Sequence, residues 1–243
     1  MKRNLSVHNI ILVLFVVLSG VFITLNLGCS GKLNDAEEHY DIGTIHWKLG
    51  RIDDAIEEYK KAISIFPNLD KAHFNLGCIY NQKGELGLAV ESFRNALEIK
   101  PDRIETHTNL GAAYEMNNMY SDAIEEYQKA LELNPNIAAS HTNLGNIYYK
   151  SEMYDKAIDE CKKALKIKPD FAEAYNNLGY IYYETGKYSF AINEYKKAIE
   201  LKPDYISAHN NLGMAYKKVG LLEKAKKESE IVKGIMKKNR KVQ

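Results

Sequence analysis

The stretch NLGYIYYETGKYSFAINEYKKAIELKPD, residues 177–204, decides the fold because its landmarks return at a fixed distance along the chain. It ends near the last of the five prolines in the sequence, which follow one another at intervals of 34 residues: Pro67, Pro101, Pro135, Pro169 and Pro203. A period of this length is typical of repeat arrays, in which each unit stacks on the next. We therefore expect six units, at residues 36–69, 70–103, 104–137, 138–171, 172–205 and 206–239.

Small and aromatic residues keep fixed positions within these units. Position 8 is always glycine and position 20 is always alanine, as in Gly179 and Ala191. Position 24 is aromatic in four units, and Cys161 and Ser229 replace it in the other two. We expect two helices per unit, near positions 1–14 and 18–30, and helices of about 14 residues are marginal alone in water. Gly at position 8 and Ala at position 20 would let the two helices touch, and the aromatic residues would fill the wider gaps between layers.

This pattern resembles the tetratricopeptide repeat family over residues 36–239. The resemblance implies an all-α superhelix of helix-turn-helix units, whose first helices line a concave groove. The sixth unit departs from the pattern at Ser229, Val232 and Lys237, so we expect a degenerate final unit that caps the array.

Turn residues predict where the helices begin and end. Position 33 carries a side chain that can cap the next helix: Asn68, Asp102, Asn136, Asp170 and Asp204. The first helix of a unit should end at a left-handed residue, which is Gly50, Gly84, Gly186, Gly220 or the tolerated substitute Asn118. Glu152 is the exception at this position.

The first 29 residues are predicted to form a signal peptide or a membrane anchor. Lys2 and Arg3 precede an uncharged apolar run over residues 10–27. As a helix it would span about 27 Å, close to the roughly 30 Å of a bilayer core. The end of the run resembles a bacterial lipoprotein signal, in which Gly28 precedes a lipidated Cys29. An uncleaved anchor is the alternative, and both place the repeats outside a bacterial membrane, on its periplasmic or extracytoplasmic side, after a short linker at residues 30–35.

The charge pattern argues against nucleic acid as a partner. The net charge is +1, but residues 217–243 carry 10 Lys and Arg against 3 Asp and Glu, and the tail at 240–243 is basic. Residues 32–216 are correspondingly acidic, so no global attraction to nucleic acid is implied.

No residue pattern predicts catalysis, a cofactor or a metal. Five histidines occupy position 4, with Tyr175 in the remaining unit: His39, His73, His107, His141 and His209. Successive layers lie about 10 Å apart, whereas zinc ligands lie about 2.1 Å from one ion, so this column cannot share a site. We identify no carboxylate that accompanies the histidines at a fixed spacing, and we expect them to pack in a semi-buried aromatic slot. The sequence therefore predicts a protein that is not an enzyme.

Position 6 carries the candidate binding residues, a ladder formed by Asn75, Asn109, Asn143, Asn177 and Asn211. These repeats are similar to those of O-linked N-acetylglucosamine transferases, and that resemblance implies that the asparagines grip the backbone of an extended peptide. Asparagine is also common at this position across the family, which leaves a purely structural role open. Aromatic residues at neighbouring groove positions would add anchors: Trp47, Phe74, Tyr149, Tyr180 and Tyr183.

The expected function is protein–protein interaction by a membrane-tethered module with a scaffold or assembly role in the bacterial envelope. The size, the repeats and Cys29 also resemble pilotin-type lipoproteins of pilus assembly. The alternatives are a self-associating structural scaffold, which would make the chain a homo-oligomer, and a non-catalytic recruiting subunit of a glycosyltransferase or of pilus or secretion assembly.

Overall fold

The structure is a computed structural model that describes residues 31–239. Every regular element in this range is an α-helix, and the helices divide into two units, which end and begin at Pro101 and Asp102. Each unit is described by itself. The expected helical repeats are therefore present, whereas the expected signal or anchor over 1–29 lies outside the described residues.

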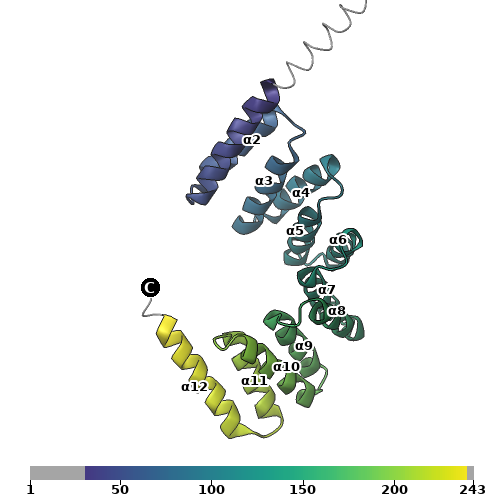
Figure 1. The fold of residues 1–243 in the computed structure, drawn as a ribbon, viewed down its shortest axis with the longest axis vertical. Coiled ribbons are helices and arrows are strands. Elements are labelled where there is room, and N and C mark those ends of the chain that lie inside the picture. Colours follow the sequence, from purple (N-terminus) through teal and green to yellow (C-terminus); the bar gives the residue numbers. More distant parts are fainter. Residues whose placement is uncertain (1–30, 240–243) are drawn as a thin grey trace, which may run out of the picture. The chain divides into compact units, whose positions relative to one another are not determined.

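Unit 1 holds the first two repeats. Residues 31–48 are helical, and they are followed by α2 (Ile52–Ile65), α3 (Asp70–Lys83) and α4 (Leu86–Ile99). In Figure 1 these helices run from purple to blue, and α3 and α4 form an antiparallel pair. The boundaries of α2, α3 and α4 match the expected helix positions to within one residue, whereas the first helix also includes residues 31–35, which were expected to form a linker.

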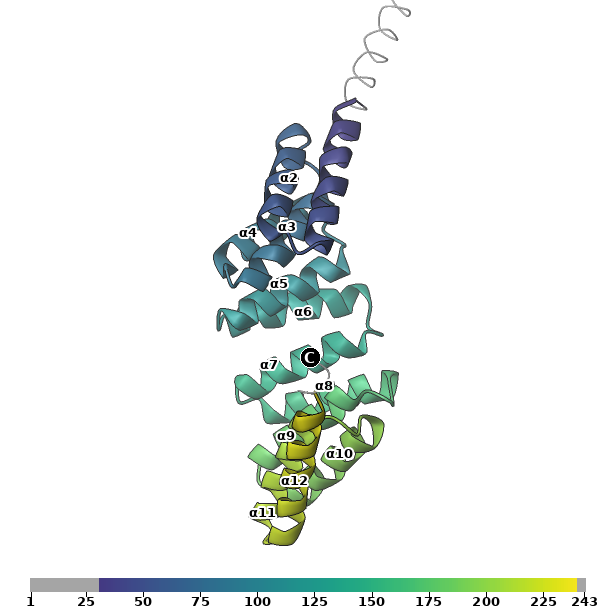
Figure 2. The same cartoon turned by 90° about the vertical axis from the view of Figure 1, so that its left-hand side faces the viewer.

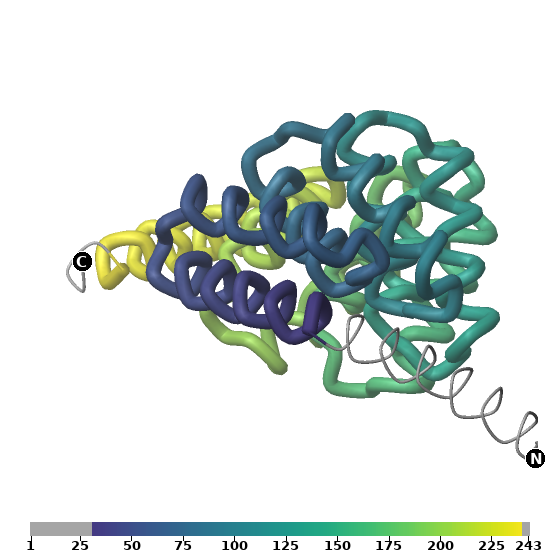
Figure 3. Tube along the Cα trace, turned by 90° about the horizontal axis from the view of Figure 1, so that it is seen from above, coloured from purple at the N-terminus to yellow at the C-terminus, as the bar shows by residue number. Residues whose placement is uncertain are grey.

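Unit 2 holds the remaining four repeats as successive helical hairpins. Its helices are α5 (Ile104–Met116), α6 (Tyr120–Leu133), α7 (Ala138–Lys150), α8 (Tyr154–Ile167), α9 (Ala172–Glu184), α10 (Tyr188–Leu201), α11 (Ile206–Lys218) and α12 (Leu222–Asn239). The first helices of neighbouring repeats also contact one another, α5 with α7, α7 with α9 and α9 with α11. Figure 2 shows α5 and α6 side by side, and Figure 3 follows the hairpins of this unit from teal to yellow.

In every hairpin but the last, the glycine at position 8 contacts the side chain at position 24. A methyl group placed on Gly179 would lie 2.8 Å from ring carbons of Tyr195, and one placed on Gly111 would lie 2.9 Å from Tyr127. These rings are fully buried. The expectation that the glycine permits close approach is confirmed. The aromatic residue contacts this glycine inside its own hairpin and also packs against the next repeat, as Tyr195 does against Leu212 and Tyr216.

The helix starts differ from the expected caps. The residue before each first helix is apolar, aromatic or basic, as at Leu69 before α3 and Ile137 before α7, and no side chain caps either helix. Leu69 is buried, so this position is used for packing. The predicted caps Asn68 and Asn136 stand one residue too early and do not serve this role.

The helix ends follow the prediction and extend it. Four glycines after first helices adopt the left-handed conformation, with φ between 74° and 77°: Gly50, Gly84, Gly186 and Gly220. Asn118 adopts it at φ 58°, as expected, and Glu152 also adopts it at φ 60°. The turn after the first helix therefore keeps its left-handed backbone even where asparagine or glutamate replaces glycine.

The final helix is longer than the other second helices, with 18 residues against 14. Ala225 and Val232 are its buried residues, and its surface is rich in lysine. This agrees with the expected polar final helix. The basic tail at 240–243 lies outside the described residues.

Candidate functional site

The first helices of the repeats in unit 2 form one continuous face, which we call the A-helix face and define by α5, α7, α9 and α11. Side chains link neighbouring helices across it: Lys150 to Glu115 at 2.8 Å, the rings of Tyr149 and Tyr180 at 5.2 Å between centroids, and Asn211 to Oδ1 of Asn176 at 3.0 Å. These links occupy the positions that the sequence assigned to a binding groove.

In unit 2 the asparagines at position 6 of the repeats lie on this face, and they differ in the hydrogen bonds that they make. Asn143 is half-buried, and its amide has no hydrogen-bond partner within residues 31–239. Asn109 donates to the backbone carbonyl of Glu105 in its own helix at 2.7 Å. Asn177 accepts a long hydrogen bond of 3.5 Å from Asn176. Asn143 therefore has the most hydrogen-bonding capacity left for a partner.

Asn75 lies in unit 1 and is used differently. Its side chain donates to the Tyr59 hydroxyl at 3.0 Å and to the Tyr40 hydroxyl at 3.3 Å, and the residue is 8% exposed. Phe74 is half-buried against Phe93, with 5.9 Å between ring centroids. Trp47, the other candidate in unit 1, is half-buried. The Asn75 amide thus joins neighbouring repeats of unit 1.

Tyrosines gather on the A-helix face around α7 and α9. We call Tyr149, Tyr154, Tyr180, Tyr183 and Tyr188 the tyrosine cluster. Tyr149 contacts both Tyr154 and Tyr180, and Tyr183 meets Tyr188 edge to face at 5.5 Å. Burial raises the pKa of the Tyr149 hydroxyl well above its usual value, and its hydrogen bond with Tyr180 and the nearby Glu184 carboxylate raise the pKa further. The cluster therefore combines apolar ring area with a nearby carboxylate, Glu184.

Tyr195 lies beneath this cluster, and its hydroxyl is buried without a hydrogen-bond partner in the described part of the chain. Burial raises the pKa of this hydroxyl, and Tyr180, Glu184, Tyr183 and Tyr149 add to the shift. The equivalent hydroxyl of Tyr59 has two partners, since Thr44 lies at 3.1 Å in addition to Asn75. A buried hydroxyl without a partner is destabilising, commonly by about 1–3 kcal/mol.

The histidines at position 4 have a partner that the sequence analysis missed. Four of them place Nδ1 at 2.6 Å from the Glu side chain 19 residues later: His39 with Glu58, His107 with Glu126, His141 with Glu160 and His209 with Glu228. The statement that no carboxylate accompanies the histidines at a fixed spacing was wrong. The spacing was visible in the sequence as Glu at position 23, but the two residues lie on different helices of the hairpin and meet only after folding.

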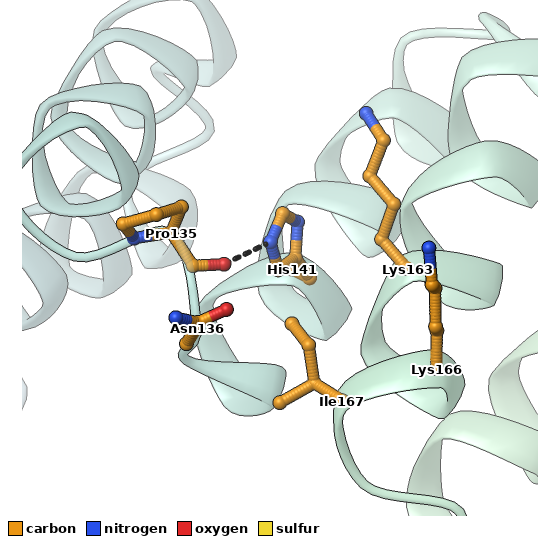
Figure 4. A pocket seen from close by; sticks show the side chains of 6 residues that line it. All are labelled: Pro135, Asn136, His141, Lys163, Lys166 and Ile167. Carbon is orange, nitrogen blue, oxygen red and sulfur yellow. Dashed lines mark hydrogen bonds between the residues drawn. The ribbon is translucent and has the colours of Figure 1, made fainter.

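His141 shows how these pairs are built. Its Nε2 lies 3.0 Å from the carbonyl of Pro135, which can only accept, so Nε2 donates. Its Nδ1 faces Glu160, and Lys163 also contacts that carboxylate at 2.9 Å. Figure 4 shows His141 reaching toward Pro135 beside a surface cleft of about 690 Å³ that Lys163 and Lys166 also line. The pairs tie the two helices of a hairpin together and to the preceding turn.

Metal and membrane features are not found in residues 31–239. No group of three or more His, Cys, Asp or Glu side chains in this range could hold a metal ion. Within the same range, none of the helices has both the length and the apolar character needed to cross a bilayer. The predicted lipidation site Cys29 lies outside the described residues.

Sequence comparison identifies the family. Profiles described as "TPR repeat" match residues 43–80, 77–118, 145–186 and 179–220, which together make up more than half of the chain. Profiles described as "Tetratricopeptide repeat" match residues 104–137 and 126–159. The chain belongs to the tetratricopeptide repeat (TPR) family. No curated protein sequence gives a significant match.

Solved TPR structures share the fold. MamA is 30% identical, with a TM-score of 0.61, and the match covers 68% of this chain and 97% of MamA. PilW, titled a widely conserved type IV pilus biogenesis factor, is 20% identical, with a TM-score of 0.73 over 83% of this chain and 98% of PilW. YrrB, titled a TPR protein with an unusual peptide-binding site, is 22% identical, with a TM-score of 0.56 over 73% of this chain and 91% of YrrB.

Membership of this family places the chain in a class of proteins that typically mediate protein–protein interaction and are generally not catalytic. The A-helix face fits that class, because it presents amide and aromatic side chains and no nucleophile held by a base. Tyr154 and Tyr188, which join the tyrosine cluster from second helices, were not among the predicted residues. Both residues follow the turn that ends a first helix, so their contacts with Tyr149 and Tyr183 depend on the geometry of that turn.

Proposed function

We propose that this TPR protein binds an extended segment of a partner protein on the A-helix face and thereby acts as a scaffold in the bacterial envelope. The observation that carries the proposal is that Asn143, whose amide has no hydrogen-bond partner in the described residues, lies on the same row of helices as half-buried tyrosine rings. An amide offers one acceptor and two donors, which match the N–H and C=O groups of an extended backbone. Tyrosine rings supply apolar contact area and are common anchors of protein interfaces.

A pull-down from envelope extract tests this binding mode. The full-length wild type is compared with the double variant Asn143→Ala/Asn177→Ala, which removes neighbouring amides of the A-helix face. The matched control is Asn136→Ala/Asn193→Ala, since both of these asparagines are exposed and lie off that face. We expect the control to retain the partner and the test variant to lose it. Equal capture by all three proteins would exclude the asparagines as the binding residues.

Membrane tethering is a separate part of the proposal. The apolar run at 10–27 and Gly28–Cys29 support a lipidated or anchored N-terminus that holds the repeats on the periplasmic or extracytoplasmic side. The intact mass of the protein purified from membranes tests it. A chain that begins at Cys29 and carries added lipid mass supports the lipoprotein form, and a chain that begins at Met1 supports the uncleaved anchor. Recovery in the aqueous fraction without any anchor would contradict both.

Self-association is a second candidate function with one specific observation in its favour. The last repeat exposes apolar side chains at Leu221, Leu222 and Met236, and Leu222 is 64% exposed. Exposed apolar residues that gather at the end of a repeat array are typical of a contact surface. Light scattering over a range of concentrations tests this candidate. Growth in mass that Leu222→Lys abolishes would support it, and a constant monomer mass would exclude it.

A further inference from the structure

The tyrosine cluster has an electrostatic character that identifies one feature of its partner. The A-helix face carries four carboxylates on α5 and α9, one lysine on α7 between them and two lysines on α11: Glu105, Glu115, Glu173, Glu184, Lys150, Lys217 and Lys218. Lys150 is paired with Glu115. Glu184 is exposed and has no ion-pair partner within residues 31–239. The carboxylate of Glu184, next to the cluster, is therefore not neutralised by an ion pair in the described part of the chain.

Five tyrosines of unit 2 that lie outside the cluster have a lysine of the chain itself over the ring. Lys156 lies over the ring of Tyr148 at 5.4 Å, and Lys197 lies over the ring of Tyr175 at 5.2 Å. Lysines also lie over the rings of Tyr120, Tyr205 and Tyr216. In the described part of the chain no lysine or arginine lies over the ring of any tyrosine of the cluster.

We propose that the partner segment places a lysine or arginine side chain on the tyrosine cluster, where the rings of Tyr149, Tyr180 and Tyr183 contact the cation and Glu184 balances its charge. This inference rests on the proposed function, because it names the chemistry of the segment that binds the A-helix face. A cation within about 6 Å of a tyrosine ring centroid is attracted by the ring quadrupole, and a nearby carboxylate adds a Coulombic attraction.

The surroundings of the buried tyrosine hydroxyls also favour a basic side chain at the cluster. The pKa of the Tyr149 and Tyr195 hydroxyls is raised, in the first place by burial and in addition by Glu184, so the negative potential of that carboxylate reaches into the cluster. An acidic side chain would be repelled there, and a neutral one would leave Glu184 unbalanced. A basic side chain is favoured by the rings and by the carboxylate together.

The test uses defined peptides and the full-length chain in non-ionic detergent. Two extended Gly/Ser peptides differ only at one central residue, which is arginine in one and glutamine in the other. The tyrosines carry 3-fluoro labels, and ¹⁹F NMR titrations report which rings respond. We expect the arginine peptide to bind at least about tenfold more tightly than the glutamine peptide and to shift the resonances of Tyr149, Tyr180 and Tyr183.

Variants assign the effect to these residues. Glu184→Gln should reduce the preference for arginine several-fold without affecting folding, since Glu184 is exposed. Tyr183→Leu should reduce it further, and Tyr183→Phe should retain most of it because the ring remains. The matched control is Glu200→Gln, an exposed carboxylate on α10. Equal binding of both peptides, or binding of neither, would overturn the inference.

Two further outcomes separate this inference from its rivals. If the envelope partner is lost by Asn143→Ala/Asn177→Ala but kept by Tyr183→Leu and Glu184→Gln, the proposed function stands and the basic side chain is excluded. If the chain self-associates and Glu184→Gln abolishes the association, the cation comes from the lysine-rich α12 of a second copy, which would overturn a separate partner segment.

Discussion

A methyl group added at Gly179 tests whether the contact between positions 8 and 24 sets the hairpin geometry. Alanine in place of glycine inside a helix is stabilising by about 1 kcal/mol when space is available. At Gly179 the new Cβ would lie 2.8 Å from Cδ1 and Cε1 of Tyr195, a ring that is fully buried. The ring must therefore move, and overpacking of this kind costs about 1–3 kcal/mol.

Gly213 is the matched control, because it holds the same position in the last repeat and meets no ring. A Cβ there would have its nearest neighbours at 3.6 Å, which is ordinary van der Waals contact. We expect Gly213→Ala to stabilise the protein by up to about 1 kcal/mol through helix propensity. We expect Gly179→Ala to destabilise it by about 1–2 kcal/mol, since the steric term at the Tyr195 ring exceeds the helix gain.

Thermal and urea unfolding of both variants, followed by circular dichroism, measure this difference. One kcal/mol corresponds to about 2–4 °C in Tm for a protein of this size. A second pair of variants in a Tyr195→Ala background completes a double-mutant cycle, in which Gly179→Ala should become neutral or stabilising. If Gly179→Ala raises Tm as Gly213→Ala does, or if the cycle shows no coupling, the ring does not set the approach of the helices.

Three further predictions follow from single residues. Glu152→Gly should stabilise the protein by about 1 kcal/mol in chemical denaturation, because Glu152 holds a left-handed backbone at φ 60°, and no gain in stability would argue against strain there. The pKa of Glu58 lies below its usual value of 4.5 because Lys61 and His39 hydrogen-bond to its ionised form. The ionised carboxylate therefore stabilises the folded protein fully above pH 4.5, and this stabilisation is lost as the pH falls through the lower pKa of the folded state. Glu58→Gln should therefore lower Tm at pH 7 by a small amount, consistent with at most about 1 kcal/mol, and the difference from wild type should disappear under acid conditions, whereas a pH-independent difference would contradict this cause. Burial raises the pKa of the Cys161 thiol to about 12, so iodoacetamide at pH 8 should modify Cys161 only when the protein unfolds, and rapid labelling of the native protein, mapped by mass spectrometry, would contradict its buried position.

The helical repeats were predictable because their signals are local and repeated. The interval between prolines, such as Pro169 and Pro203, gives the length of a repeat, and the glycine before the second helix in four of the six repeats gives the turn. A departure from the pattern in one repeat is recognised by comparison with the other repeats. The turn position of Glu152 can therefore be assigned from its place in the 34-residue period. This redundancy explains why the helix boundaries of the interior repeats agree with the structure to within a residue or two, whereas the first and last helices extend beyond the expected ends.

The side-chain partners were not predictable to the same degree, because they depend on residues of different helices. Asparagine stands at position 6 in five repeats. Asn75 donates to two tyrosine hydroxyls and Asn211 donates to Asn176, whereas Asn143 has no hydrogen-bond partner among residues 31–239. The residue type is the same and the neighbours differ. The histidine–glutamate pairs are the opposite case, since their spacing of 19 residues is constant and could have been read from the sequence.

The surroundings of one buried hydroxyl show how neighbouring residues can change while the repeat is kept. Thr44 and Asn75 satisfy the hydroxyl of Tyr59 in unit 1. In unit 2 the equivalent positions around Tyr195 hold Tyr180, and an asparagine that bonds to its neighbour instead, so the Tyr195 hydroxyl has no hydrogen-bond partner within the described residues. A fold that satisfies this hydroxyl at Tyr59 but leaves it unsatisfied at Tyr195 carries a local cost to stability. The ring of Tyr180, which stands where unit 1 has Thr44, joins the tyrosine cluster, so this one replacement removes a hydrogen bond from the core and adds aromatic area to the A-helix face.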